Sequence, residues 1–324
     1  MNDGISIIIS TYNRSEQLLK IITNLDKQSK DHKTEIIIVD SFSEDNSEYL
    51  IKNLKAKLFN KNINYYNIKQ NILSAKRNFG IFNSKYSKII LLDDDCIPLD
   101  NFIEEYNIDF QNIDNKTILS GVVNYSDTEL NKSSFLRFRK KKHFQVEHVK
   151  KNFNIQIKNF VAMNMGFINH EKIKKIGFFD ERFLGYGFED YEFAYRMKQH
   201  GYNLHQTKAS ILHDEGNICL SKYLKKYYHL GRDGMKNLLI INKEAAKTTV
   251  YYKIENNFFI KTIINISLLI SLLSVYEKLL LFIEKYFFYK PDFLYNFGRL
   301  IAYLRGTQKR HKSNIYDIKK NWYE

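Results

Sequence analysis

The chain has 324 residues, 44% of them hydrophobic, which is enough apolar material for one large domain with an appendage. Two prolines and two cysteines without metal-type spacing argue against long disordered stretches and against a disulfide framework. The formal net charge of +14 favours an anionic partner such as a phosphorylated substrate, a membrane surface or nucleic acid, or simply a basic surface. The amino terminus lacks the pattern of a secretory signal, so we expect a cytoplasmic protein.

The first part of the chain repeats one strand–helix unit. Short apolar runs rich in β-branched residues predict buried strands over residues 5–9, 35–39, 62–66 and 88–92. Apolar residues at helical spacing predict helices that begin at Ser15, near Leu50 and at Ser74. Strands that alternate with helices predict an α/β fold, in which a mostly parallel central sheet is flanked by helices.

The next part of the chain is less regular. We expect strands over residues 118–123, 160–168 and 209–212, and a helix over residues 191–200. The polar segment between the first two of these strands contains the basic run Arg139–Lys142, which we interpret either as a solvated loop or as a contact for phosphate groups. From about residue 218 the pattern becomes helical. We therefore expect an α/β domain over residues 1–217 and a helical region over residues 218–324.

The helical region contains a very apolar segment over residues 258–288. Its uncharged run, residues 262–276, falls short of the roughly 20 residues that a membrane span needs. An amphipathic helix at a membrane surface and a buried core helix both fit this pattern, and a true span or hairpin is a third alternative.

Polar residues follow three of the predicted strands. The sequence Thr11-Tyr12-Asn13-Arg14 follows the first, Asp40 ends the second, and Asp93-Asp94-Asp95 follows the fourth. Ligands of such sheets bind beyond the carboxyl ends of the strands. Three consecutive carboxylates repel one another unless a cation binds them, and hard cations such as Mg²⁺ or Mn²⁺ prefer carboxylate oxygens. The position therefore favours a metal site over a solvated acidic turn.

Five motifs in this order resemble the family 2 glycosyltransferases of the GT-A fold, a Rossmann-like architecture. They are Ser10–Arg14, Val39–Asp40, Ala75–Asn78, Leu92–Asp95 and Gly185–Asp190. The resemblance covers about residues 1–215. The last motif, with Phe178–Glu181 before it, also resembles the acceptor-side motif of galactosyl- and N-acetylgalactosaminyltransferases. The resemblance implies inverting transfer of a sugar from a nucleotide diphosphate donor, most often a UDP-sugar, to an acceptor hydroxyl.

The resemblance also implies a donor-binding site. Asp40 would accept a hydrogen bond from the base, and Arg77 would approach the base or the diphosphate. Ser41 and Phe42 follow Asp40 where the family often has a second acid and a glycine, a departure that concerns the base pocket. The predicted nucleotide-sugar-binding residues are Thr11, Tyr12, Arg14, Asp40, Arg77, Asp93 and Asp94.

A divalent metal, Mn²⁺ or Mg²⁺, is implied by the same resemblance. Asp93 and Asp95 match the two acids of the family's D-x-D motif, with Asp95 as the firmer ligand. His213 follows a short predicted strand, where related members have a histidine that completes the metal site, although a lone histidine there is also compatible with a structural role.

The acceptor side of the predicted site lies near residue 190. Inverting transfer needs a carboxylate that takes the proton of the attacking hydroxyl, and Asp190 is our candidate for this general base. An acid at a helix N-terminus can also serve only to satisfy free amides. Tyr186, Gly187 and Glu189 are predicted to contact the acceptor.

The sequence thus predicts a metal-dependent hexosyltransferase. We expect a UDP-sugar of the galactose, glucose or N-acetylhexosamine type as donor, and a glycan or lipid-linked acceptor in surface polysaccharide assembly. The helical region would dock at the inner face of the cytoplasmic membrane. A nucleotidyltransferase is an alternative, but Thr11–Arg14 lacks the glycine-rich loop that it would need. A non-enzymatic nucleic-acid-binding protein is another alternative, but we find no such motif and expect no nucleic-acid partner.

Overall fold

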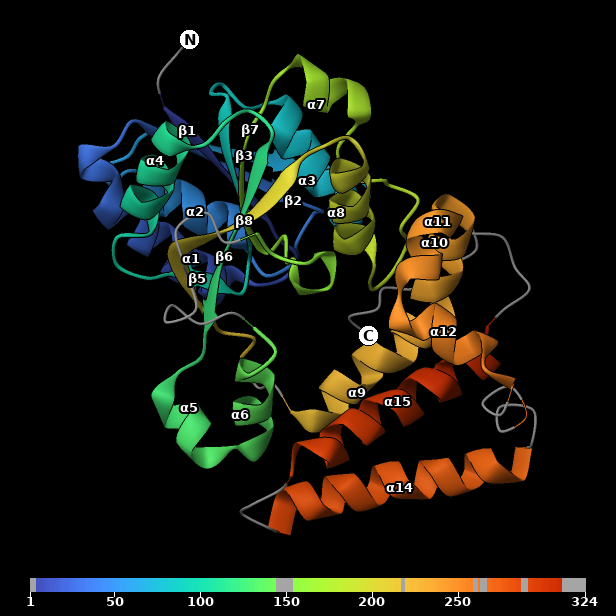
Figure 1. Cartoon of the computed structure of the whole chain (residues 1–324). Helices are drawn as coiled ribbons and strands as arrows, with labels where there is room; N and C mark the ends of the chain where they lie inside the picture. The colour runs from blue at the N-terminus through green and yellow to red at the C-terminus, as the bar shows by residue number, and fades with distance from the viewer. Residues whose placement is uncertain are drawn as a thin grey trace. The chain divides into compact units, whose positions relative to one another are not determined.

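The computed structural model describes residues 4–143, 154–216, 219–258, 262, 267–286 and 291–310, and within residues 267–286 the side chains from residue 275 onward except that of Glu277. The chain forms two compact units (Figure 1). The first unit is formed by residues 1–126, 142–181 and 193–216. The second unit is formed by residues 127–141, 182–192 and 217–324. Two short segments that precede residue 217 therefore belong to the second unit.

The first unit is built around an eight-stranded sheet with the order β3-β2-β1-β4-β7-β6-β8-β5. Strands β1 to β4 pair in parallel, as do β6 and β8, whereas β7 and β5 run antiparallel to their neighbours. The predicted α/β fold with a mostly parallel sheet is confirmed. The strands are β1 (Ile5–Ser10), β2 (Thr34–Asp40), β3 (Ile63–Asn67), β4 (Lys88–Asp93), β5 (Cys96–Pro98), β6 (Thr117–Asn124), β7 (Asn164–Ile168) and β8 (Asn203–His213).

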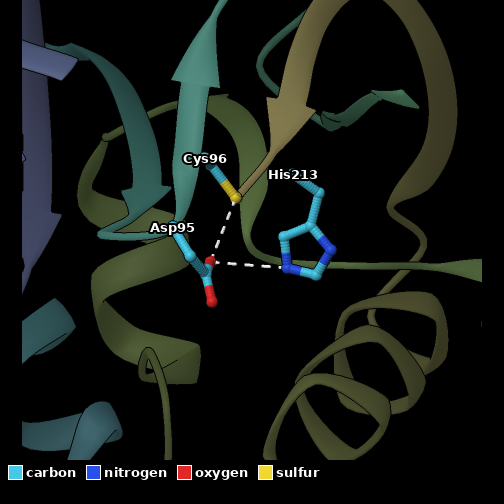
Figure 2. Close-up of side chains that lie close together, drawn as sticks. All are labelled: Asp95, Cys96 and His213. Carbon is cyan, nitrogen blue, oxygen red and sulfur yellow. Dashed lines mark hydrogen bonds and ion pairs between the residues drawn. The ribbon is translucent and has the colours of Figure 1, made fainter. Parts of the chain in front are cut away.

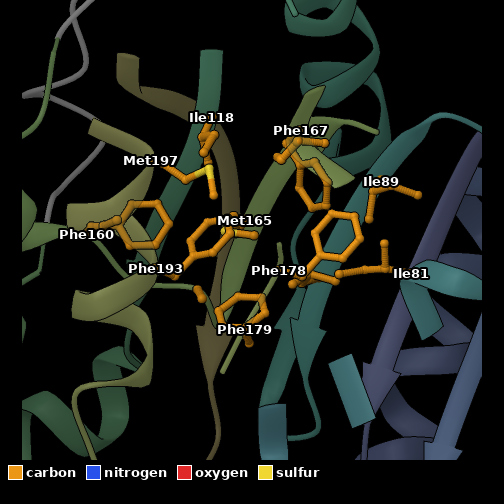
Figure 3. Close-up of a cluster of buried hydrophobic side chains, with 14 of the residues drawn as sticks. Ile81, Ile89, Ile118, Phe160, Met165, Phe167, Phe178, Phe179, Phe193 and Met197 are labelled. Carbon is orange, nitrogen blue, oxygen red and sulfur yellow. The ribbon is translucent and has the colours of Figure 1, made fainter. Parts of the chain in front are cut away.

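Helices cover both faces of this sheet and bury the apolar stripes that the sequence predicts. In α1, for example, the residues at helical spacing from Leu18 to Leu25 are fully buried. Figure 3 shows the core cluster in which Phe193 and Met197 of α8 pack with Phe160, Met165 and Phe179. The helices of this unit are α1 (Ser15–Gln28), α2 (Ser47–Lys55), α3 (Leu73–Phe82), α4 (Phe102–Asn112), α7 (Glu171–Ile176) and the greater part of α8 (Glu189–Gln199).

Three strand predictions need correction. The strand expected over residues 160–168 begins only at Asn164, because Ile157–Asn159 forms a 3₁₀ turn and the amide of Phe160 donates to the carbonyl of Ile157. Strand β8 begins at Asn203, six residues before the start that we expected. Its first half was not predicted because polar side chains alternate there with buried ones. Strand β5 is only three residues long and was not predicted.

The second unit is helical, as the sequence predicts for its carboxyl-terminal part. Parts of the apolar segment 258–288, namely residues 259–261, 263–266 and 287–288, lie outside the described residues. Within the described ranges we find no helix with the length and apolarity that crossing a membrane requires. The unit contains α5 (Asp127–Lys132), α6 (Ser134–Lys140), α9 (Leu220–His229), a π-helical turn (Leu230–Gly234), α10 (Met235–Ile241), α11 (Lys243–Thr248), α12 (Val250–Asn256), α14 (Ser267–Tyr286) and α15 (Asp292–Gln308).

The basic run of the sequence spans the end of α6, with Arg139 and Lys140 in its last turn and with Lys141 and Lys142 exposed after it. Arg139 lies in the last turn of α6 and is buried, with its guanidinium 5.3 Å from the ring centre of Tyr223 and 6.0 Å from that of Phe135. Lys141, which follows the helix, forms an exposed ion pair with Asp292 at 3.0 Å. Arg139 thus stabilises helix packing inside the second unit through cation–π contacts.

Candidate active site

The predicted donor residues gather at one edge of the sheet in the first unit. Ser10 at the end of β1 lies between Val39 of β2 and Asp93 of β4 in the strand register. The residues that leave these three strands therefore come together. The backbone amide of Tyr12 donates to Asp94 Oδ2 at 3.2 Å, and the hydroxyl of Thr11 is buried without a hydrogen-bond partner. A buried, unsatisfied hydroxyl at this edge is available to a ligand.

Each acid of the Asp93–Asp95 triad has a cationic neighbour. Arg77, whose side chain is 2% exposed, donates to both carboxylate oxygens of Asp93 at 2.9 and 3.2 Å. Arg14 lies 3.2 Å from Asp95 Oδ2 and 3.6 Å from Asp94 Oδ1. These two arginines reduce the repulsion among the three carboxylates. Arg77 thus contacts Asp93 directly and can orient its carboxylate.

Lys76 is a third cation of this edge, and the sequence analysis assigned it no role. Its Nζ donates to the carbonyl of Thr11 at 2.7 Å and lies 5.5 Å from the ring centre of Tyr12. Burial lowers the pKa of Lys76 to about 8, although the charges of Asp94 and two other acids oppose this shift. A lysine in a helix usually points to solvent. Its burial could therefore be predicted only by knowing which face of α3 packs on the sheet.

Asp40 fixes the loop that follows β2. Its carboxylate accepts hydrogen bonds from the amide of Ser41 at 2.7 Å, from Ser43 through both amide and hydroxyl at 2.9 and 2.6 Å, and from the hydroxyl of Tyr65 at 2.9 Å. Phe42, at the tip of this loop, has a φ of 58° and is exposed. This is the left-handed conformation that glycine adopts most readily, and Phe42 stands where the family that the motifs resemble often has a glycine.

The pairing of β5 with β8 builds the candidate metal site. Cys96 lies opposite His213 in the register, so the preceding residue, Asp95, comes beside the imidazole. Asp95 Oδ1 is 3.5 Å from both His213 Nε2 and Cys96 Sγ (Figure 2). Glu215 Oε1 lies 3.2 Å from the same imidazole nitrogen, and the other nitrogen, Nδ1, is buried without a hydrogen-bond partner. Glu215 was missed in the sequence, although it is spaced two residues from His213.

These side chains fit a hard divalent cation. Carboxylate oxygens and an imidazole nitrogen are suitable ligands for Mn²⁺, and carboxylates suit Mg²⁺. Burial and the charge of Asp95 raise the pKa of the Cys96 thiol well above its usual range, so the thiol keeps its proton and donates to Asp95. Asp95, His213 and Glu215 are thus the residues that would hold the ion, while Cys96 orients Asp95.

The stability of the metal-free protein should depend on the protonation of Asp94. Burial raises its pKa from 3.8 to about 6, with Arg14 opposing this shift and the neighbouring acids adding to it. Since the folded state binds this proton more tightly, the free energy of unfolding should fall as the pH rises from about 4 through about 6. We expect Asp94→Asn to raise the free energy of unfolding by about 3 kcal/mol at pH 7.5 in the presence of a chelator. Urea unfolding at pH 4.5 and 7.5 measures this difference, and an equal effect at both pH values would contradict it.

The predicted acceptor residues belong to the second unit, within residues 182–192. Tyr186 lies beneath Lys226, whose Nζ is 5.9 Å from the ring centre. Gly187 has a φ of 102°, which only glycine adopts without strain, and Glu189 and Asp190 begin α8. The predicted donor and metal residues thus belong to the first unit, and the predicted acceptor residues belong to the second.

Two family profiles match the chain. The one described as glycosyl transferase family 2 matches residues 6–176, and the one described as the N-terminal domain of galactosyltransferase matches residues 142–218. The chondroitin synthase of Escherichia coli is 27% identical over 245 residues, a match that covers 66% of this chain and 35% of that protein. The hyaluronan synthase of Pasteurella multocida is 30% identical over 228 residues, with 61% and 23% covered. The chain spans about a quarter to a third of the length of these relatives.

A solved structure with a similar fold is the mannosyltransferase PcManGT from Pyrobaculum calidifontis in complex with GDP-Man and Mn²⁺. The TM-score is 0.62 at 13% identity, and the match covers 95% of this chain and 87% of that one. This likeness confirms the GT-A fold that the motifs imply. The family match covers more than half of the sequence and sets aside the nucleotidyltransferase and nucleic-acid-binding alternatives. The chain belongs to glycosyltransferase family 2.

Proposed function

We propose that this glycosyltransferase moves a sugar from a UDP-sugar, with inversion, to a hydroxyl group of a glycan or lipid-linked oligosaccharide in surface polysaccharide assembly. The observation that carries this proposal is the acidic triad at the carboxyl edge of the sheet, in which Asp94 is buried and Asp93 and Asp95 are partly exposed, with Arg14, Lys76 and Arg77 as cationic neighbours. Cations and metal-type ligands at one edge suit a nucleotide diphosphate. The relatives named as polysaccharide synthases support the substrate class.

The first unit would bind the donor and stabilise the leaving group. Asp95, His213 and Glu215 would hold Mn²⁺ or Mg²⁺, which when bound supplies positive charge next to the diphosphate. Lys76 and Arg14 add fixed positive charge at the same edge. Charge that is already in place when the diphosphate leaves lowers the barrier, because no reorganisation is needed at that moment.

Asp190 would act as the general base. One of its carboxylate oxygens would accept the proton of the acceptor hydroxyl as the hydroxyl oxygen forms a bond to the anomeric carbon. At the same time the bond between that carbon and the diphosphate oxygen breaks, and the electron pair leaves with the nucleoside diphosphate. Tyr186, Gly187 and Glu189, close to Asp190 in sequence, would contact the acceptor.

A panel of nucleotide sugars tests the proposal. The protein is incubated with each donor, with Mn²⁺ or Mg²⁺ and with glycan acceptors, and the release of nucleoside diphosphate is measured together with the acceptor product. Chelator-treated samples serve as controls. Release of nucleoside diphosphate from a UDP-sugar with formation of a β-linked product from an α-linked donor is expected. Turnover limited to GDP-sugars, or a product that retains the donor's configuration, would contradict it.

We also propose that α14 docks the protein on the inner face of the cytoplasmic membrane. Its second half presents a stripe of four exposed apolar or aromatic residues, each at least half exposed: Val275, Leu279, Phe282 and Tyr286. Lys278 and Lys285 are exposed beside the stripe, whereas Glu284 accepts a hydrogen bond from Tyr295 at 2.5 Å. An apolar stripe with lysines at its edge is typical of helices that lie in the interface of an anionic bilayer.

A double substitution on this stripe should release the protein from vesicles. Replacing Leu279 and Phe282 with glutamate removes two side chains that would enter the interface, each worth about 1.5–3 kcal/mol when buried. We expect binding to vesicles with phosphatidylglycerol to weaken by at least about tenfold in a flotation assay. Phe59→Glu is the control, because Phe59 is 60% exposed in the first unit. Unchanged flotation of the double variant would contradict the docking proposal.

A further inference from the structure

The segment that leads to Asp190 has an unusual backbone. Gly185, Gly187 and Phe188 have φ angles of 93°, 102° and 74°. A positive φ is unfavourable for a side chain as large as phenylalanine, and such conformations persist only where the surrounding structure enforces them. The residues that pack on the Gly185–Asp190 loop must therefore hold its backbone in this conformation.

The π-helical turn Leu230–Gly234 packs directly against this loop within the second unit. A methyl group on Gly187 would lie 2.3 Å from Leu230 Cδ1, and one on Gly234 would lie 2.9 Å from the carbonyl oxygen of Tyr186. Both approaches are too close for any side chain other than hydrogen. Gly187 thus lets the side chain of Leu230 reach the backbone of the loop, and Gly234 lets the backbone of the turn approach the backbone carbonyl of Tyr186. Single π turns inside helical segments occur frequently at functional sites.

Hydrogen bonds from the helices after the π turn hold both ends of the loop. Asn237 of α10 is 1% exposed and donates through Nδ2 to the carbonyl of Leu184 at 3.0 Å. Beyond Asp190, the hydroxyl groups of Tyr191 and Thr248 are 2.8 Å apart, and Asn242 donates to Glu192 at 3.1 Å. A buried amide bonded to a loop carbonyl fixes the path of that loop, because leaving either group unpaired is costly.

We propose that Leu230 and Asn237 are positioning residues, which hold the Gly185–Asp190 loop so that the Asp190 carboxylate is placed for proton abstraction. This inference rests on the proposed role of Asp190 as the base. It gives the carboxyl-terminal helices a part in catalysis that is separate from membrane docking. A misplacement of about 1 Å in a reacting group can reduce the rate about 100-fold, so small shifts of the loop should be measurable.

Leu230→Ala tests the contact with Gly187, and Asn237→Leu tests the hydrogen bond with little change in volume. We expect each variant to lower kcat for transfer by about 10- to 100-fold, with the Kd for UDP and Mn²⁺ unchanged, since the donor residues belong to the first unit. The matched control is Leu280→Ala, in the same unit. Leu280 is fully buried and would meet a methyl group on Gly298 at 2.5 Å, in the packing of α14 on α15. Leu280→Ala should lower the Tm about as much as Leu230→Ala does, without lowering kcat.

A double-variant cycle separates positioning from general loss of stability. In the Asp190→Asn background, Leu230→Ala should change the residual transfer rate less than about threefold, because a residue that acts through Asp190 has nothing left to position. Wild-type kcat in both single variants, or a loss in Leu280→Ala equal to that in Leu230→Ala, would overturn the inference. So would an undiminished effect of Leu230→Ala in the Asp190→Asn background. Wild-type turnover of Asp190→Asn itself would instead remove the base from the proposed function.

Discussion

Replacing Asp190 with asparagine is expected to abolish most sugar transfer while leaving donor binding intact. Asparagine is close to aspartate in size but cannot accept a proton from the acceptor hydroxyl, and loss of a general base costs about 10²- to 10⁴-fold in kcat. The proposed donor residues lie in the other unit, so the Kd for UDP and Mn²⁺ should stay within about twofold of the wild-type value, a difference well under 1 kcal/mol. Product formation and calorimetric binding measure the two quantities on the same sample.

The same substitution discriminates between catalysis and helix capping. Asp190 lies in the first turn of α8, where acids often serve only to satisfy backbone amides and the helix dipole. Asparagine lacks the charge that interacts favourably with the helix dipole, so a purely helix-stabilising role predicts a slightly lower Tm together with unchanged turnover. An unchanged Tm with lost turnover supports the base. Glu189→Gln is the neighbouring control and should mainly raise the KM for the acceptor.

The central strands could be predicted because burial on both faces leaves a clear pattern. Every residue of β1 and β2 is buried, and their apolar runs gave the two strands to within one residue at each end. The first half of strand β8 was not predicted because polar residues such as His205 and Lys208 alternate with buried ones. Strand β5 pairs only with β8, and a three-residue strand has no periodicity from which it could be found.

The candidate site could be predicted where residues are adjacent in sequence and not where the fold brings them together. The Asp93–Asp95 triad is visible in the sequence, whereas the burial of Lys76 depends on how α3 packs on the sheet. His213 and Glu215 come beside Asp95 only because the pairing of β5 with β8 places the end of β8 next to it. The union of residues 127–141 and 182–192 with the helical unit likewise rests on long-range contacts that no local pattern encodes.

Replacing Asp95 with asparagine should remove the response of the protein to divalent metal. Asp95 Oδ1 lies 3.5 Å from His213 Nε2, and Arg14 contacts the other carboxylate oxygen. Because the side chain of asparagine is neutral, Asp95→Asn would weaken the binding of a cation at this position. Wild-type Tm should rise when Mn²⁺ and UDP are added, because a ligand that binds only the folded state stabilises it. In Asp95→Asn this rise should largely disappear, and kcat/KM should fall by about 100-fold or more.

In the absence of metal the same substitution should change the Tm in the opposite direction. Without metal, Asp95 repels the neighbouring acids, so Asp95→Asn should keep or slightly raise the Tm measured in chelator. Asp214→Asn is the matched control, because Asp214 follows His213 and forms an ion pair with Lys20 at 2.9 Å. It should lose a little stability and keep the full response to Mn²⁺ and UDP. A metal-induced rise in Tm that survives in Asp95→Asn would place the cation elsewhere, and a loss of that rise in both variants would point to general damage at the end of β8.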